Sequence, residues 1–280
     1  MKIKSFFVPM LMLFVVALTA CGGNKTETDS SQTTDKPEPV IEKYLTLDTT
    51  TSDTIRTFIF PKECRVEFID SAMPTESNII LCVAAAFTNK DYQKYDKFDP
   101  ILVANDYVTK GVYKKGYKCP ISMTGGFAYI NGSKHYFFKG KNNIHFIDAQ
   151  RTNGYYFQQN LAIFNGIIQP KAAYSDGKGG IQPYRFLCEL TSGDLAIVEV
   201  RNLQYHDAMK MALNNPIRGL DKSIKIKHAL YLDMGGWSDG WYRDSHYTYD
   251  INTDHKIDTI HQNNHQTNWI VVRKKIDNRD

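Results

Sequence analysis

Residues suited to chemistry gather at the end of one short apolar run, residues 229–232, which leads directly to the carboxylate of Asp233. The next residues include two glycines, a tryptophan and a serine: Gly235, Gly236, Trp237 and Ser238. An apolar run of this length followed by turn residues predicts a buried strand. Glycine lets the backbone turn sharply and approach a ligand closely. The pattern therefore predicts a site for a sugar or another polar ligand. A tight turn beneath an aromatic cluster is the alternative.

A second candidate is Arg185, which follows Pro183 and Tyr184 at the start of another predicted strand. A guanidinium can hold a phosphate or a carboxylate through two parallel hydrogen bonds. Arg185 is therefore a candidate for binding an anionic group of a substrate. A surface ion pair is the alternative role for this side chain.

Two further motifs fit their patterns less well. The sequence from Gly236 to Gly240 matches G-x-S-x-G, the nucleophile elbow of serine hydrolases, but that motif needs a helix after the serine, and turn- and strand-like residues follow Ser238. Asp250, Asn252 and Asp254 have the spacing of a calcium loop, but His255 stands where that loop needs glycine. Three later histidines lack helical metal-ligand spacing: His255, His261 and His265. No metal or cofactor is required by these residues.

The N-terminus has the pattern of an exported protein. Lys2 and Lys4 precede the apolar run 6–17, and small residues then lead to Cys21. A run this short before a cleavage site predicts a signal peptide rather than a membrane span. The site is similar to a bacterial lipobox, which implies cleavage before Cys21 and lipidation of its thiol. Acyl chains on Cys21 would attach the protein to a membrane.

Composition divides the chain into a signal peptide at 1–20, a disordered tether at 21–39 and a single domain at 40–280. Gly22 does not indicate retention at the inner membrane, so we expect the outer membrane of a Gram-negative bacterium. The net charge of +4 is too small and too dispersed to indicate a nucleic-acid partner. The 17 tyrosines and 15 phenylalanines suit strands and surfaces that contact glycan or peptide.

Four cysteines remain besides Cys21, and an exported compartment permits disulfides. They allow either buried free thiols or disulfide pairs: Cys64, Cys82, Cys119 and Cys188.

The local patterns predict many strands and one clear helix. Strands are expected at 55–60, 64–68, 78–87, 126–130, 134–138, 143–148, 154–164, 184–190, 195–200, 229–232 and 269–272, and the helix at 202–214. Asn131-Gly132 and the turn at 191–194 are hairpin signals. The fold class is therefore α+β: a β-rich mixed sheet with few helices.

Several of these segments together resemble the phosphodiester glycosidase domain family, the type found in the mammalian enzyme that uncovers mannose 6-phosphate tags. The family's Leu-Asp-Gly-Gly-Gly-Ser motif is similar to Leu-Asp-Met-Gly-Gly-Trp-Ser at 232–238. Arg185 begins a hairpin similar to the family's Arg-x-Ala-Ile-Gly hairpin. Gln158 or Gln159, with the Asn-Gly pair at 165–166, resembles its Gln…Asn-Gly segment.

The resemblance implies an envelope lipoprotein that hydrolyses a glycosidic bond to a phosphodiester in a small molecule or glycan, without a cofactor. Arg185 would neutralise the phosphate, and Asp233 would act as acid/base or orient the sugar. The remaining site residues would contact substrate: Gly235, Gly236, Trp237, Ser238 and Gln159. The family's early Asn-Gly-Gly-Phe-Phe stands here as Ala-Ala-Ala-Phe-Thr at 84–88. The alternative is a non-catalytic lipoprotein that binds glycan or peptide with the same fold.

Overall fold

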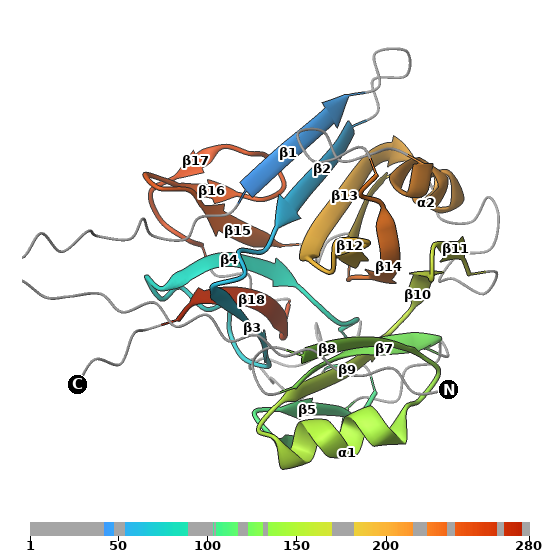
Figure 1. The fold of residues 1–280 in the computed structure, drawn as a ribbon. Coiled ribbons are helices and arrows are strands. Elements are labelled where there is room, and N and C mark those ends of the chain that lie inside the picture. The colour runs from blue at the N-terminus through green and yellow to red at the C-terminus, as the bar shows by residue number, and fades with distance from the viewer. Residues whose placement is uncertain are drawn as a thin grey trace, which may run out of the picture. The chain divides into compact units, whose positions relative to one another are not determined.

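The computed structural model describes residues 42–47, 54–88, 103, 105–116, 123–130, 134–169, 182–214, 223–233, 239–261 and 266–275. All of them belong to one compact unit, Glu38–Asp280. Within these ranges the chain forms three sheets and two helices (Figure 1). The predicted signal peptide, the tether and Cys21 lie outside the described residues.

The largest sheet has seven strands in the order β1-β2-β13-β12-β14-β10-β11. They are β1 (Glu42–Leu47), β2 (Thr54–Ile59), β10 (Leu161–Phe164), β11 (Ile167–Ile168), β12 (Gln182–Leu190), β13 (Leu195–Leu203) and β14 (Ile226–Tyr231). β12 and β13 form the expected long hairpin, in which Leu187 lies opposite Ile197. Gly193 has a positive φ of 85° in its turn, a conformation that favours glycine. Helix α2 (Tyr205–Asn214) packs on one face of this sheet.

The second sheet has six strands in the order β17-β16-β15-β4-β18-β3. They are β3 (Cys64–Ile69), β4 (Ile79–Ala84), β15 (Gly240–Arg243), β16 (Thr248–Asp250), β17 (Lys256–Ile257) and β18 (Trp269–Lys274). β4 is buried along its whole length, as its uninterrupted apolar sequence predicts. A Cβ atom at Gly240 would lie 2.3 Å from the carbonyl oxygen of Cys82, so glycine is needed for β15 to approach β4.

The third sheet has five strands in the order β6-β5-β9-β7-β8. They are β5 (Tyr107–Thr109), β6 (Val112–Lys114), β7 (Gly125–Ile130), β8 (Lys134–Lys139) and β9 (Tyr155–Gln159). β7 and β8 pair as the predicted hairpin, whose tip at 131–133 lies outside the described residues. Helix α1 (Asn143–Arg151) packs on its outer face around Ala149.

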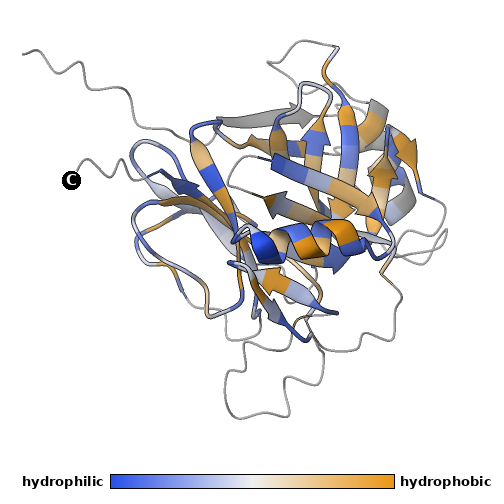
Figure 2. Cartoon of the chain, turned by 60° about the horizontal axis from the view of Figure 1, so that its bottom comes forward, coloured by the Kyte–Doolittle hydropathy of each residue, from blue (hydrophilic) through white to orange (hydrophobic). Residues whose placement is uncertain are grey.

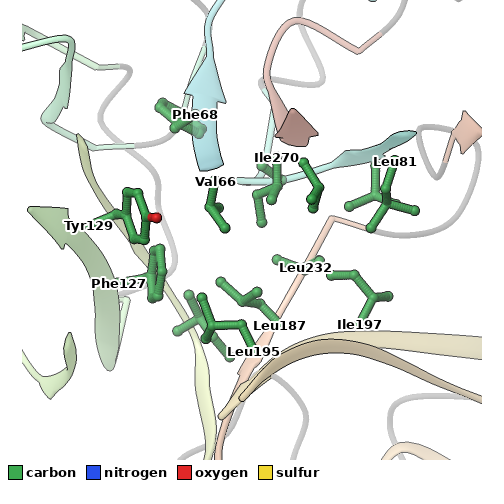
Figure 3. Packing of buried hydrophobic residues seen from close by; sticks show 14 of the residues in the cluster. Val66, Phe68, Leu81, Phe127, Tyr129, Leu187, Leu195, Ile197, Leu232 and Ile270 are labelled. Atoms are coloured by element: carbon green, nitrogen blue, oxygen red, sulfur yellow. The ribbon is translucent and has the colours of Figure 1, made fainter. Parts of the chain in front are cut away.

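The main core forms where the inward faces of the three sheets meet (Figure 3). Its members come from each sheet in turn, among them Val66 and Ile270, Phe127 and Tyr129, and Leu187, Ile197 and Leu232. The opposite faces carry smaller apolar clusters, two of which are covered by the helices. Strand alternation therefore divides each sheet between the common core and an outer layer.

Three expectations about the elements are wrong. Every described strand pair is antiparallel, and there are three sheets rather than one mixed sheet. The predicted strand at 143–148 is α1, because the Asn142 side chain accepts the His145 backbone N–H (3.0 Å) and caps a helix whose inner face packs on the sheet. The predicted strand at 154–164 is two strands in different sheets, divided at Asn160.

The predicted helix at 202–214 begins later, at Tyr205, since β13 continues to Leu203. Among the described cysteines, Cys64, Cys82 and Cys188 are buried free thiols, whereas Cys119 lies outside the described residues. Neither helix in the described part of the chain is long and apolar enough to cross a membrane.

Two histidines and a glutamate connect the five-stranded sheet to the seven-stranded sheet. His135 on β8 and His228 on β14 each place Nε2 3.8 Å from the same oxygen, Oε2 of Glu189 on β12. Lys227 Nζ donates to the other carboxylate oxygen (2.9 Å). His228 Nδ1 accepts the backbone N–H of Asn165 (3.3 Å), so the neutral ring carries its proton on Nε2. Burial lowers the pKa of both imidazoles below 6.5, although Glu189 opposes this effect.

Because of His135 and His228, we expect the folded protein to lose stability in mild acid. The unfolded histidines bind protons below about pH 6.5, whereas the folded ones resist protonation, so the unfolded state binds more protons and folding weakens as pH falls. Urea denaturation should show a lower midpoint at about pH 5.5 than at about pH 7.5. The decrease should be smaller for His135→Gln/His228→Gln. An equal decrease in wild type and the double variant would contradict this assignment.

Candidate functional site

The candidate anion-binding residue, Arg185, lies on the inward face of β12 and is completely buried. Its neighbour Leu187 belongs to the main core, whereas Phe186 packs under α2, so strand alternation places Arg185 between the sheets. The role of a surface ion pair is therefore wrong for this residue. Its guanidinium is instead part of a buried cluster of charges.

Glu199 on β13 is the centre of this cluster. It lies directly opposite Arg185 on β12 and directly opposite Arg56 on β2, so three adjacent strands contribute one row of charges. Arg185 donates to Glu199 Oε2 through Nη2 (2.8 Å) and Nε (3.2 Å), and Arg56 Nη2 donates to Oε1 (2.6 Å). Arg201 Nε also donates to Oε1 (2.5 Å).

The electrostatics of the row keep Glu199 ionised. Burial alone would raise the pKa of this carboxyl, but the guanidinium groups of Arg185, Arg56 and Arg201 outweigh it and hold the pKa below its usual value. Because Glu199 is fully buried, its charge depends on these partners rather than on water.

The turn after β16 supplies the remaining partners of the arginines. Asn252 Oδ1 accepts from Arg185 Nη2 (2.9 Å), and Asp254 pairs with Arg56 Nη1 (2.7 Å). Asp250 stabilises the turn by accepting the backbone N–H groups of Asn252 and Thr253 (2.9 and 2.8 Å). Of the three residues with calcium-loop spacing, Asn252 and Asp254 therefore direct side-chain oxygens to the arginines, and Asp250 holds the turn.

The cluster retains a positive charge and unused donors. Three arginines face two carboxylates, Glu199 and Asp254, which leaves a net charge of +1 among these side chains. Arg185 Nη1 is buried and has no hydrogen-bond partner among the described residues, and the same holds for Arg56 Nε. Buried donors of this kind normally have a partner. These two N–H groups are the donors of the row that an anion would use, and neither atom is exposed to solvent in this structure.

Asp233, the candidate acid, lies close to the backbone of Arg185. Leu232 donates its N–H to the Arg185 carbonyl (3.0 Å), and Asp233 follows at the end of β14. Asp233 is only 3% exposed, and its Oδ2 accepts the backbone N–H of Thr88 (3.1 Å). Its own N–H donates to the Ala85 carbonyl (2.8 Å). The two candidate residues therefore come from adjacent strands, although their side chains have different partners.

A buried polar network holds the segment after β4 against Asp233. Asn268 bonds both backbone groups of Ala86, accepting at 2.6 Å and donating at 3.0 Å. Thr88 Oγ1 donates to Gln266 (2.8 Å), whose amide donates to the Asn268 carbonyl (2.9 Å). Sequence reasoning missed Thr88, Gln266 and Asn268 as site residues. A polar run immediately before the apolar strand β18 is the signal that could have indicated Gln266 and Asn268, whereas Thr88 follows β4 without such a signal.

The glycine-rich loop is attached at both ends to the same place in the fold. Asp233 bonds to Ala85, and on the other side Ala84 donates its N–H to the Asp239 carbonyl (3.0 Å). Both ends of the loop therefore lie at the C-terminal end of β4. The loop's predicted substrate-binding residues lie outside the described residues: Gly235, Gly236, Trp237 and Ser238. A strand, β15, follows the loop, so the helix that a nucleophile elbow needs is absent at residues 240–243.

Gln159, another predicted substrate contact, ends β9 and is 2% exposed. Its Oε1 accepts the backbone N–H of Asn160 (3.2 Å), and the Asn160 carbonyl accepts the N–H of Tyr231 (2.8 Å). Gln159 is thus next in sequence to Asn160, which bonds to Tyr231 at the end of β14. Tyr231 lies two residues before Asp233. No three His, Cys, Asp or Glu side chains within the described ranges form a group that could hold a metal ion.

Two cavities lie away from Arg185 and Asp233. One of about 300 Å³ is lined by Cys64, Tyr129 and His135 and by the β12–β13 turn. The other, of about 490 Å³, is lined by Arg65, Tyr129 and Tyr155. Neither cavity is lined by a residue of the charge row. The candidate site is therefore defined by the arginine cluster and by the two ends of the glycine-rich loop.

The charge row predicts a large effect of neutralising Glu199. Glu199→Gln would leave the buried guanidiniums of Arg185 and Arg56 without their shared carboxylate, which should cost about 3–5 kcal/mol of unfolding free energy. Urea denaturation measures this change. As a control, Asp207→Asn removes one partner of an exposed pair with Lys210 and should change stability by no more than about 0.5 kcal/mol. Equal effects of the two substitutions would contradict the central role of Glu199.

Comparison with known proteins gives a fold but no family. No family model matches the sequence, and no curated protein matches it. The catalytic domain of zebrafish N-acetylglucosamine-1-phosphodiester alpha-N-acetylglucosaminidase, auto-inhibited by its pro-peptide, is similar with a TM-score of 0.53 and 11% identity over 85% of this chain and 84% of that one. A hypothetical protein from Synechocystis has a TM-score of 0.44 and 9% identity over 84% of this chain and 62% of that one, too low to support an argument. The chain therefore has fold-level similarity to a phosphodiester glycosidase catalytic domain.

Proposed function

We propose that the protein hydrolyses a glycosidic bond to a phosphodiester. The observation that carries this proposal is the buried arginine row, which has a net positive charge and a guanidinium N–H of Arg185 without a partner among the described residues. A phosphodiester is an anion that meets both features. The fold-level similarity to a phosphodiester glycosidase supports the same chemistry.

In this proposal some residues interact with the phosphate and others with the sugar. Arg185 neutralises charge that develops on the phosphate as the glycosidic bond breaks, and such preorganised stabilisation is often the largest catalytic contribution. Asp233 acts as acid/base or orients the sugar. Backbone N–H groups of Gly235 and Gly236 donate to the substrate, while Trp237, Ser238 and Gln159 contact the sugar.

A second candidate is a non-catalytic module that binds glycan or peptide. The hydrogen bond from Thr88 to Asp233 and the 3% exposure of Asp233 favour it, because the carboxylate already has a backbone donor. Ala84 stands where the family that the sequence resembles has asparagine, and Ala85 and Ala86 stand where it has glycines. All three alanines are fully buried, which makes this part of the site less polar.

For the location, we propose a lipid anchor on Cys21 and attachment to the outer membrane of a Gram-negative bacterium. The support is the sequence of the N-terminus, with its short apolar run, small residues and cysteine. The partners of the protein are then the membrane, through this anchor, and a small-molecule or glycan substrate, with no nucleic acid.

The test uses the unacylated mature chain, residues 21–280 with Cys21→Ser, and a panel of sugar-1-phosphodiesters. We expect release of free sugar by this chain. Arg185→Lys keeps the charge but loses the planar guanidinium fork, and should lower kcat/KM by about 100-fold or more. Asp233→Asn keeps the shape of the side chain but removes its acid/base function, and should lower kcat by about 100-fold or more.

Lys62→Ala is the matched control, since its side chain is 80% exposed and lies outside the charge row, and its kcat/KM should equal that of the parent. Thermal melting of each variant separates lost activity from lost folding. Turnover that persists in both site variants would refute the assigned roles. Glycan binding without turnover, unchanged by Asp233→Asn, would establish the binding module instead.

A further inference from the structure

The five-stranded sheet and α1 expose most of the large apolar side chains on the described surface. Seven such side chains are exposed among the described residues, and five belong to this sheet and its helix: Val112, Tyr113, Tyr136, Ile144 and Ile147. Ile144 and Ile147 stand nearly one turn apart on α1 and are 70% and 40% exposed. Contiguous exposed apolar side chains of this kind mark interaction surfaces.

Ring contacts place two of these side chains, Tyr113 and Tyr136, beside α1, which carries the two isoleucines. Tyr113 of β6 contacts Phe146 of α1 edge-to-face, with ring centroids 5.4 Å apart. On the other side of the helix, Tyr136 of β8 stacks on His145, with centroids 4.3 Å apart. The helix therefore lies between the two tyrosines, and apolar and polar residues alternate along it (Figure 2). We call Tyr113, Tyr136, Ile144 and Ile147 the α1 patch.

The same part of the chain is strongly basic. Residues 105–116 and 134–151 contain seven basic and two acidic residues, a net charge of +5, against +4 for the whole chain. Six of the basic residues are exposed: Lys110, Lys115, Lys134, Lys139, Lys141 and Arg151. These two stretches therefore carry a strongly positive net charge.

We propose that the α1 patch docks the domain on an anionic bilayer surface. Exposed isoleucines on a short helix suit the boundary between headgroups and acyl chains, and tyrosines favour the membrane interface. Lysines around such a patch bind anionic headgroups while their stems cover apolar surface. A soluble polyanion would match the charge alone, whereas a bilayer matches both the charge and the apolar side chains.

The length of the N-terminal segment is consistent with this docking. A tether of the length of residues 21–39 spans at most roughly 65 Å, while a domain of 240 residues is about 45 Å across. An acyl anchor on Cys21 would therefore let any face of the domain reach the bilayer. The docking surface would then determine which face does so.

The test measures co-sedimentation of the unacylated mature chain with vesicles, so that no acyl chain contributes. We expect partition onto vesicles of equal parts phosphatidylglycerol and phosphatidylcholine to exceed partition onto pure phosphatidylcholine by at least about tenfold. Ile144→Ser/Ile147→Ser should lower partition by about tenfold. Lys110→Ala and Arg151→Ala should each lower it by about fivefold.

Two exposed positions outside the patch provide controls: Ile167→Ser, where the residue is 66% exposed on β11, and Lys62→Ala. Neither should change partition by more than about twofold. Equal partition onto both vesicle types, or equal effects of patch and control variants, would overturn the proposal. Binding to dextran sulfate that depends on Lys110 and Arg151 but not on the isoleucines, with no vesicle binding, would also overturn it and identify an acidic-glycan surface.

Discussion

The buried carboxylate of Glu199 requires charged partners, and several strands of the fold supply them. A carboxylate on the inward face of a central strand needs cationic partners, and strands on both sides supply them at the same level, Arg185 and Arg56. These guanidiniums need further acceptors, which come from Asn252 and Asp254 in the turn between β16 and β17. The charge row thus joins the seven-stranded sheet to the turn after β16, in addition to the main core that the sheets share. Removing one partner of such a row would leave a buried charge without compensation, which is strongly destabilising.

The C-terminal end of β4 organises the other half of the candidate site. Here the two ends of the glycine-rich loop meet, because Asp233 and Asp239 bond to neighbouring residues of one strand end. Asn268 satisfies the backbone of the same segment from the final strand. Three stretches distant in sequence therefore converge without forming one continuous motif. Rigid strands on each side limit how far the loop ends can move, which suits a preorganised binding site.

Much of the local structure was predictable from the sequence. The hairpins β7–β8 and β12–β13 have turn residues between apolar runs, and the buried strand β4 has an uninterrupted apolar sequence. The strand before Asp233 was also predictable. The α1 segment was mistaken for a strand because its short mixture of apolar and polar residues fits either period, and packing on the sheet decides between them. Tertiary packing also decides that a strand ends at Asn160, because the chain passes there from the five-stranded sheet to the seven-stranded sheet.

The sequence by itself determined the β-rich class and singled out Arg185 and Asp233 as candidate residues, because these follow from local pattern and residue chemistry. Tertiary structure alone decided the partners of those residues. Glu199 and Asn252 reach Arg185, and Thr88 reaches Asp233, through contacts between strands far apart in the chain. Strand pairing sets such contacts, and a linear pattern does not encode which strands become neighbours.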